Sequence, residues 1–175
     1  LAPIALNIEA SVPEARDPLT VVGFGQTQPR VDFDDLGLGN NNTISIEPND
    51  LERTKMGNVT SKNDLRTTTM ALQQVQVKAI SHQACNGQDM YRGRIRKDVM
   101  LCAGLEEGGK DSCYGDSGGP IFTQQGGEML QIGIVSFGSG CARPNRPGIY
   151  SRVSGAYDWI QTQICDLSTN PPNSC

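Results

Sequence analysis

Histidine is nearly absent from this chain, since His82 is the only one among 175 residues. Cys-x-x-Cys pairs are missing as well, so we expect no zinc or other metal site and no cofactor. No apolar run comes near the roughly 20 residues that cross a bilayer. A net charge of −4 gives no reason to expect nucleic acid or an acidic membrane as a partner.

An initiator methionine and a signal peptide are also lacking, which suggests a chain cut out of something longer. Charged residues are somewhat scarce at 19%, whereas 20 glycines and 10 prolines make the chain rich in turn formers. This composition is typical of short strands joined by many turns. The length suggests one domain.

Short strand signals recur along the chain, and residues 74–79 alternate with the period of two that marks a half-buried strand. Tyr157, Ile160 and Ile164 instead recur at helical spacing, after a possible cap at Ser154. We therefore predict an all-β fold, a small six-stranded antiparallel barrel with a short C-terminal helix. The expected strands lie near residues 20–24, 74–79, 100–103, 120–123, 129–136 and 148–153.

Residues 26–70 differ from the rest, being rich in Asn, Asp, Gly and Thr with few apolar positions, and we read them as one long loop. Asp32 and Asp34 followed by Gly37 imitate the start of a calcium-binding EF-hand loop. Leu36 and Thr43 occupy two of the required ligand positions, so the pattern fails. We expect solvated loop acids instead.

Six cysteines in a turn-rich domain favour an oxidising compartment, and spacing alone leaves their pairing open. Asn41 and Asn58 begin Asn-x-Thr glycosylation sequons, which fit a secreted protein.

The segment Gly115-Asp116-Ser117-Gly118-Gly119-Pro120 carries the chemistry. Its glycines allow positive φ, so the N–H groups of Gly115 and Ser117 can point at one place beside the Ser117 hydroxyl. A hydroxyl nucleophile beside two converging donors is suited to acyl transfer, because the donors stabilise the oxyanion of the tetrahedral intermediate.

Residues 107–122, which contain this segment, closely resemble the nucleophile loop of chymotrypsin-fold serine proteases, trypsin in particular. Residues 134–142 and 146–153 resemble the same family in the same order, and Gly23-Phe24-Gly25 resembles the opening of its second barrel. The resemblance implies that residues 1–165 form the C-terminal Greek-key barrel of such a peptidase. Residues 26–70 are then an insertion, and residues 166–175 a disulfide-tethered tail.

The family's base is a histidine oriented by an aspartate, and both precede the serine. The family's histidine segment is absent here, and His82 is expected to be a surface polar residue before a disulfide. The resemblance thus implies a secreted serine endopeptidase fragment whose His and Asp come from an N-terminal half, missing or on a separate chain. By itself this chain should be inactive. The alternatives are a non-catalytic homologue acting as a binding or adaptor module, and a truncated inactive product.

Asp111 matches the base of the specificity pocket in trypsin-like enzymes, Ser112 a polar lining position, and Gly138 and Gly148 the open walls. The resemblance therefore implies cleavage of protein or peptide substrates after Arg or Lys. Asp116 matches the aspartate that pairs with the amino terminus freed by zymogen cleavage.

Ser136 matches the serine that hydrogen-bonds the catalytic aspartate, and Phe137 stands where a tryptophan is usual. Residues 136–138 would offer backbone groups to an extended substrate. The resemblance also implies the disulfides Cys85–Cys102 and Cys113–Cys141, which leaves Cys165 and Cys175 to close a loop at the tail.

Overall fold

The computed structural model describes residues 4–27, 71–172 and 175. The predictions for residues 28–70, which include the acids at 32–35 and the sequons at Asn41 and Asn58, lie outside the described residues.

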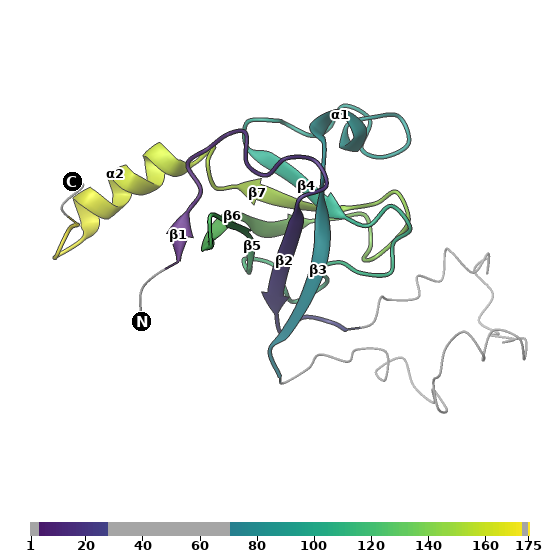
Figure 1. The fold of residues 1–175 in the computed structure, drawn as a ribbon, viewed down its shortest axis with the longest axis horizontal. Helices are drawn as coiled ribbons and strands as arrows, with labels where there is room; N and C mark the ends of the chain where they lie inside the picture. The colour runs from purple at the N-terminus through teal and green to yellow at the C-terminus, as the bar shows by residue number, and fades with distance from the viewer. Residues whose placement is uncertain (1–3, 28–70, 173–174) are drawn as a thin grey trace, which may run out of the picture.

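Six antiparallel strands close into a barrel, as the sequence predicts (Figure 1). Around the barrel the order is β6-β5-β2-β3-β4-β7, and β7 pairs with β6 to close it. This is a Greek-key order, because β4 skips to β7 and β5 returns to β2. The strands are β2 (Pro18–Gly23), β3 (Gln73–Ile80), β4 (Met100–Gly104), β5 (Pro120–Gln125), β6 (Glu128–Phe137) and β7 (Gly148–Arg152).

One further strand, β1 (Ala5–Leu6), was not expected from the sequence and pairs in parallel with the first part of β6, ahead of the residues that pair with β7. It has only two residues, so it offers no alternation to recognise. Asn7 follows it and is buried, with its side chain hydrogen-bonded to the carbonyls of Glu9 and Val12.

The alternation in β3 has the predicted effect, since Val77 and Ala79 are buried while Gln76 and Lys78 are exposed. Inward-facing side chains from all six strands fill the barrel, so burial of apolar surface holds it together. The main cluster contains Val12, Leu19, Val21, Val77, Ala79, Leu101, Ala103, Ile121, Ile132, Val135 and Tyr150.

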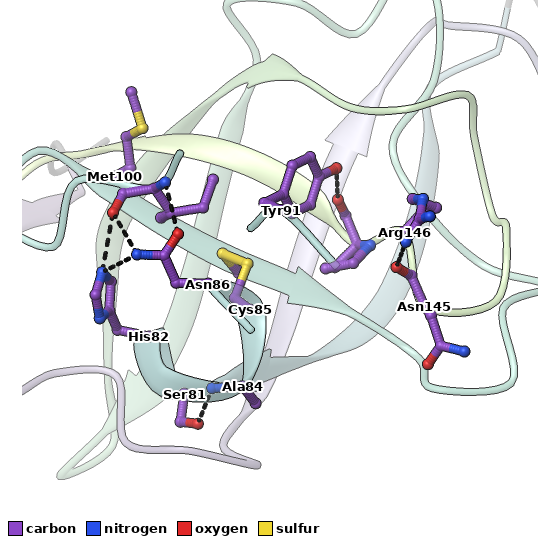
Figure 2. The surroundings of a disulfide bond; sticks show 12 residues. Ser81, His82, Ala84, Cys85, Asn86, Tyr91, Met100, Asn145 and Arg146 are labelled. Atoms are coloured by element: carbon purple, nitrogen blue, oxygen red, sulfur yellow. Dashed lines mark hydrogen bonds between the residues drawn. A yellow bond between two sulfur atoms is a disulfide. The ribbon is translucent and has the colours of Figure 1, made fainter. Parts of the chain in front are cut away.

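A smaller apolar cluster lies under α1 (His82–Cys85). This helix has one turn and is too short to be predicted from sequence periodicity. Ser81 caps this helix, because its hydroxyl accepts a hydrogen bond from the Ala84 N–H at 3.2 Å. The disulfide between Cys85 (Figure 2) and Cys102 joins α1 to β4. Ile95 is buried in the same cluster.

The C-terminal helix α2 (Tyr157–Leu167) forms where expected, but the predicted cap at Ser154 is wrong. The N-cap is Ala156, which makes no side-chain cap bond, and the Ser154 hydroxyl is buried without a hydrogen-bond partner in the described structure. The reason is the turn between Val153 and Ala156, whose backbone bond of 2.9 Å delays the helix past the serine.

Helix α2 projects away from the barrel and buries none of its residues among those described (Figure 1). Trp159 is 66% exposed and Leu167 76%. The disulfide Cys165–Cys175 ties the chain's last residue back to this helix. Neither helix of the described ranges is long and apolar enough to cross a membrane.

Truncation of a core side chain tests the barrel. Ile132→Ala should lower the free energy of unfolding by about 2–5 kcal/mol, because Ile132 is fully buried in β6 and a cavity would remain. Met129→Ala, in the same strand at a position 41% exposed, should cost less than about 1 kcal/mol. Urea unfolding measures both, and equal losses would contradict the assignment of the core.

Candidate active site

The loop between β4 and β5 carries the candidate nucleophile, and a disulfide fixes its position. Cys113 in this loop bonds to Cys141 in the loop between β6 and β7. The backbone folds back on itself at Gly115, whose φ is +99°, a value that residues with a Cβ rarely adopt. The serine that follows is therefore presented at the surface rather than inside a strand.

The Ser117 side chain is exposed, and two N–H groups beside it are free. Among the described residues, the N–H groups of Gly115 and Ser117 make no hydrogen bond. Those of Asp116, Gly118 and Gly119 donate to backbone carbonyls at 2.8–3.0 Å. Two N–H groups without acceptors, one residue apart in the chain, are the pattern that an oxyanion site requires.

A cavity of about 210 Å³ opens beside Ser117. It brings together seven of the site residues expected from the sequence and runs between the loops that Cys113–Cys141 joins. These lining residues are Asp111, Ser112, Ser117, Ser136, Phe137, Gly138 and Gly148.

Asp111 lies in this cavity as a half-buried carboxylate. It accepts hydrogen bonds from the backbone N–H of Ser112 at 2.8 Å and of Ala142 at 3.1 Å. Burial raises the pKa of Asp111 to about 6; the two hydrogen bonds oppose the rise, and the charge of Asp116 adds to it. The carboxylate is therefore incompletely compensated, and a cation in the cavity would stabilise its charged form.

The end of the cavity has room only because residue 148 is a glycine. A Cβ added to Gly148 would lie 2.8 Å from Asp111 Oδ1 and 3.1 Å from Tyr150 Oη. At Gly138 an added Cβ would lie 3.2 Å from the Gly140 carbonyl oxygen. A side chain at residue 148 would thus crowd the carboxylate.

Tyr150 belongs to the site, although sequence reasoning did not select it. Its side chain is fully buried, and its hydroxyl lies 3.0 Å from Ser112 Oγ. Burial raises the pKa of Tyr150 above its ordinary value, so the phenol is neutral. The sequence does contain a signal for Tyr150. It lies in the predicted 148–153 strand, and the hydroxyl of a buried tyrosine needs a hydrogen-bond partner.

Tyr91 is a second residue that the sequence did not indicate. Its hydroxyl donates to the Pro147 carbonyl at 2.6 Å and accepts from the Ser139 N–H at 3.3 Å. Its ring meets Phe137 edge to face, with centroids 6.4 Å apart. Tyr91 therefore positions the loop that forms one wall of the cavity.

Asp116 is held by backbone donors from two loops. Its carboxylate accepts from the Gly25 N–H at 2.8 Å and from the Cys113 N–H at 2.9 Å. A Cβ on Gly25 would lie 2.5 Å from both carboxylate oxygens, and one on Gly23 would lie 2.0 Å from Oδ1. The Gly-Phe-Gly sequence is thus explained by close approach of backbone to carboxylate.

A second cavity, of about 260 Å³, is lined by both Asp116 and Asp111. Gln26 also lines it, and its buried Oε1 has no hydrogen-bond partner in the described structure. Two carboxylates and one acceptor without a donor make this cavity suited to a cationic group.

His82 lines neither cavity. It is half-buried on α1, with Nε2 2.9 Å from the Ile95 carbonyl oxygen and 3.3 Å from Asn86 Nδ2 (Figure 2). The described residues also contain no group of three His, Cys, Asp or Glu side chains that could hold a metal ion.

Comparison with known proteins agrees with this geometry. A family model described as Trypsin matches residues 36–160, which is more than half of the chain. The chain belongs to the trypsin family of serine proteases.

Three curated members of the trypsin family illustrate the similarity. Testisin of Homo sapiens is 45% identical over 105 residues, which are 58% of this chain and 33% of that protein. Trypsin eta of Drosophila erecta is 48% identical over 93 residues, 53% of this chain and 34% of that protein. Trypsin-1 of Astacus astacus is 42% identical over 127 residues, which are 70% of this chain and 53% of that protein. The chain thus spans between a third and about half of the length of these trypsin relatives.

Substitution of Gly25 tests how Asp116 is held. Gly25→Ala should lower the free energy of unfolding by about 1.5–3 kcal/mol, because the new Cβ displaces the carboxylate from its backbone donors. Urea unfolding of Gly25→Ala, Asp116→Ala and the double variant forms a thermodynamic cycle. The two losses should be strongly non-additive, whereas simple additivity would contradict this contact.

Proposed function

We propose that this chain supplies the nucleophile, the oxyanion donors and the specificity pocket of a trypsin-like endopeptidase that cleaves after Arg or Lys. The observation that carries the proposal is a half-buried carboxylate, Asp111, in the same cavity as Ser117. No cationic side chain among the described residues forms an ion pair with it. The partner that its charge requires is therefore expected from the substrate.

The carboxylate in the lining of this cavity of about 210 Å³ supports an arginine or lysine side chain as its occupant. Its stem would lie between Gly138 and Gly148, and its charged head would reach Asp111 by charge-assisted hydrogen bonds. The hydroxyl groups of Ser112 and Tyr150, 3.0 Å apart, lie beside the carboxylate and offer further acceptors. The peptide bond that follows the basic residue would then lie near Ser117.

Hydrolysis follows the acyl-transfer course that these groups support. Ser117 Oγ attacks the substrate carbonyl carbon, a base takes the hydroxyl proton, and the N–H groups of Gly115 and Ser117 hold the resulting oxyanion. The base then gives the proton to the leaving amine. A water molecule, activated by the same base, releases the acyl group from the serine.

The base has to come from outside these residues, because the chain's one histidine lies on α1 with its Nε2 against the Ile95 carbonyl. We propose that an N-terminal half, on the same or a separate chain, contributes the histidine and the aspartate, and that Ser136 binds that aspartate. The exposed apolar residues of α2, Trp159, Ile164 and Leu167, support a docking surface for such a half. Without it, activity should be lower by several orders of magnitude.

Asp116 is proposed to pair with an amino terminus freed by proteolytic activation. The cavity of about 260 Å³ beside it and the unpartnered Gln26 Oε1 support this, since an ammonium group would supply the missing donors.

A secreted location is proposed as well, because the three disulfides and the family are typical of secreted proteins.

The pH dependence of ligand binding tests the pocket. Benzamidine should bind only when Asp111 is ionised, so its affinity should rise with pH through about 6 and level off above 7. The direction follows from the raised pKa, because below 6 the carboxyl group is mostly neutral and attracts a cation weakly. Isothermal titration of the wild type and of Asp111→Asn measures this, and pH-independent binding in the wild type would contradict the assignment.

Peptide hydrolysis by the chain together with its N-terminal half tests the function. Peptides with Arg or Lys before the scissile bond should be cleaved, and matched peptides with Glu should not. Ser117→Ala should lower kcat by about 10⁴-fold or more. Ser139→Ala is the matched control outside the lining of the cavity and should retain activity.

Two outcomes would count against the enzyme. Hydrolysis that survives Ser117→Ala would contradict the role of this serine. Benzamidine binding without any hydrolysis, when both halves are present, would instead identify a non-catalytic homologue that uses the pocket for binding.

A further inference from the structure

The loop between α1 and β4 concentrates positive charge in a chain whose net charge is −4. Four cationic residues fall within six positions, and all four are exposed. Two more arginines come from the loop between β6 and β7, which Arg146 joins to the first loop by donating to the Asp89 carbonyl. We call these six residues the basic surface: Arg92, Arg94, Arg96, Lys97, Arg143 and Arg146.

Burial of Ile95 determines where its neighbours point. Ile95 is 4% exposed, and its backbone is held on both sides by the Asn86 side chain. The Ile95 N–H donates to Asn86 Oδ1 at 2.9 Å, and Asn86 Nδ2 donates to the Ile95 carbonyl at 3.1 Å. His82 Nε2 lies 2.9 Å from the same carbonyl oxygen and 3.3 Å from Asn86 Nδ2, and Figure 2 shows these two side chains next to each other. Arg94 and Arg96, on either side of Ile95, are both exposed.

The segment is also anchored before Ile95. A tight turn at Arg92 and Gly93, both with positive φ, is closed by the Arg94 N–H bonded to the Tyr91 carbonyl at 3.1 Å. Tyr91 itself is buried, and the disulfide Cys85–Cys102 lies in the same apolar cluster. A charged segment fixed in this way loses less conformational entropy when it binds than a mobile tail would.

Three acidic residues lie in this region: Asp89, Asp98 and Glu106, whose carbonyl accepts a hydrogen bond from the Asn145 N–H at 3.4 Å. They do not cancel the six positive charges. Asp89 shares a shallow hollow with Arg143 and Arg146 and offsets one of them. Asp98 interacts with Arg152 on β7: burial lowers the pKa of Arg152, and the negative charge of Asp98 opposes that change. Arg94, Arg96 and Lys97 form no ion pair among the described residues and remain open to solvent.

We infer that the basic surface binds a linear sulfated polysaccharide. Guanidinium groups donate paired hydrogen bonds to oxyanions such as sulfate, and several cations in a row suit a polymer rather than a single anion. Residues 92–97 contain no aromatic side chain on which a nucleic-acid base could stack. None of the six residues lines the Ser117 cavity, so this inference does not depend on the proposed hydrolysis.

Heparin is the probe for the test. The full chain should bind immobilised heparin at physiological salt, and the affinity should fall steeply as NaCl rises. Arg94→Gln/Arg96→Gln should weaken binding about tenfold and make the salt dependence shallower by roughly 1.5 in the slope of log K against log salt. Arg94→Lys/Arg96→Lys keeps the charge but not the paired donors. Its heparin affinity should lie between that of the wild type and that of Arg94→Gln/Arg96→Gln.

A matched control removes two positive charges elsewhere. Arg16 and Lys78 are exposed and lie outside the basic surface. Arg16→Gln/Lys78→Gln should leave heparin affinity within about twofold of the wild type. Near-UV circular dichroism should show that all variants keep the native fold, since neither arginine in the test pair makes a side-chain hydrogen bond in the described structure.

Three results would overturn the inference. The first is no heparin binding by the wild type at physiological salt, and the second is equal loss in the test pair and the control pair. The third is binding of double-stranded DNA as tight as that of heparin, with the same loss in Arg94→Gln/Arg96→Gln, which would indicate a nucleic-acid surface instead.

Discussion

Partly buried carboxylates held by backbone N–H groups organise the candidate site. Asp111 and Asp116 lie in one loop, and each accepts two backbone hydrogen bonds, one of them from a segment distant in sequence. Asp111 lines both cavities of the site, and Asp116 lines one of them. Because buried negative charge without a cation is unfavourable, this arrangement is poised for positively charged partners.

The geometry depends on residues that have no side chain or are cross-linked. Gly25 and Gly148 allow Asp116 and Asp111 to come within contact distance of the backbone, as the positions of a hypothetical Cβ demonstrate. The disulfide Cys113–Cys141 then holds the two loops that form the walls. Packing in the barrel core fixes the strands from which these loops emerge, so the site's precision derives from the six-stranded scaffold.

Most of the fold follows from sequence, for reasons that individual residues illustrate. Alternation over 74–79 predicts β3 because one of its faces packs in the core while the other meets solvent. The four-residue helix α1 has no periodicity to detect, and the two-residue β1 forms only because β6 is beside it. Ser154 has the right chemistry for a cap, but a turn closed by the hydrogen bond from the Ala156 N–H to the Val153 carbonyl delays the helix.

The candidate site could be predicted in part. The Gly115–Pro120 segment predicts the candidate nucleophile because its glycines and serine lie next to each other in sequence. Tyr150 and Tyr91 join the site through contacts with Ser112 and Pro147, which are distant in sequence, so no local pattern gives their partners. The basic surface is visible as a run of charges, but only burial of Ile95 shows that Arg94 and Arg96 face solvent together.

The central claim is that the Asp111 carboxylate is partly desolvated and has no cationic partner in the free protein. The pKa of this one group tests the claim directly. Carbon-detected NMR can follow the Asp111 carboxyl signal against pH, with Asp111→Asn to assign it. The account predicts a pKa of about 6 in the free protein and a clear fall when benzamidine is bound. A pKa near the ordinary value of 3.8, unchanged by the ligand, would contradict it.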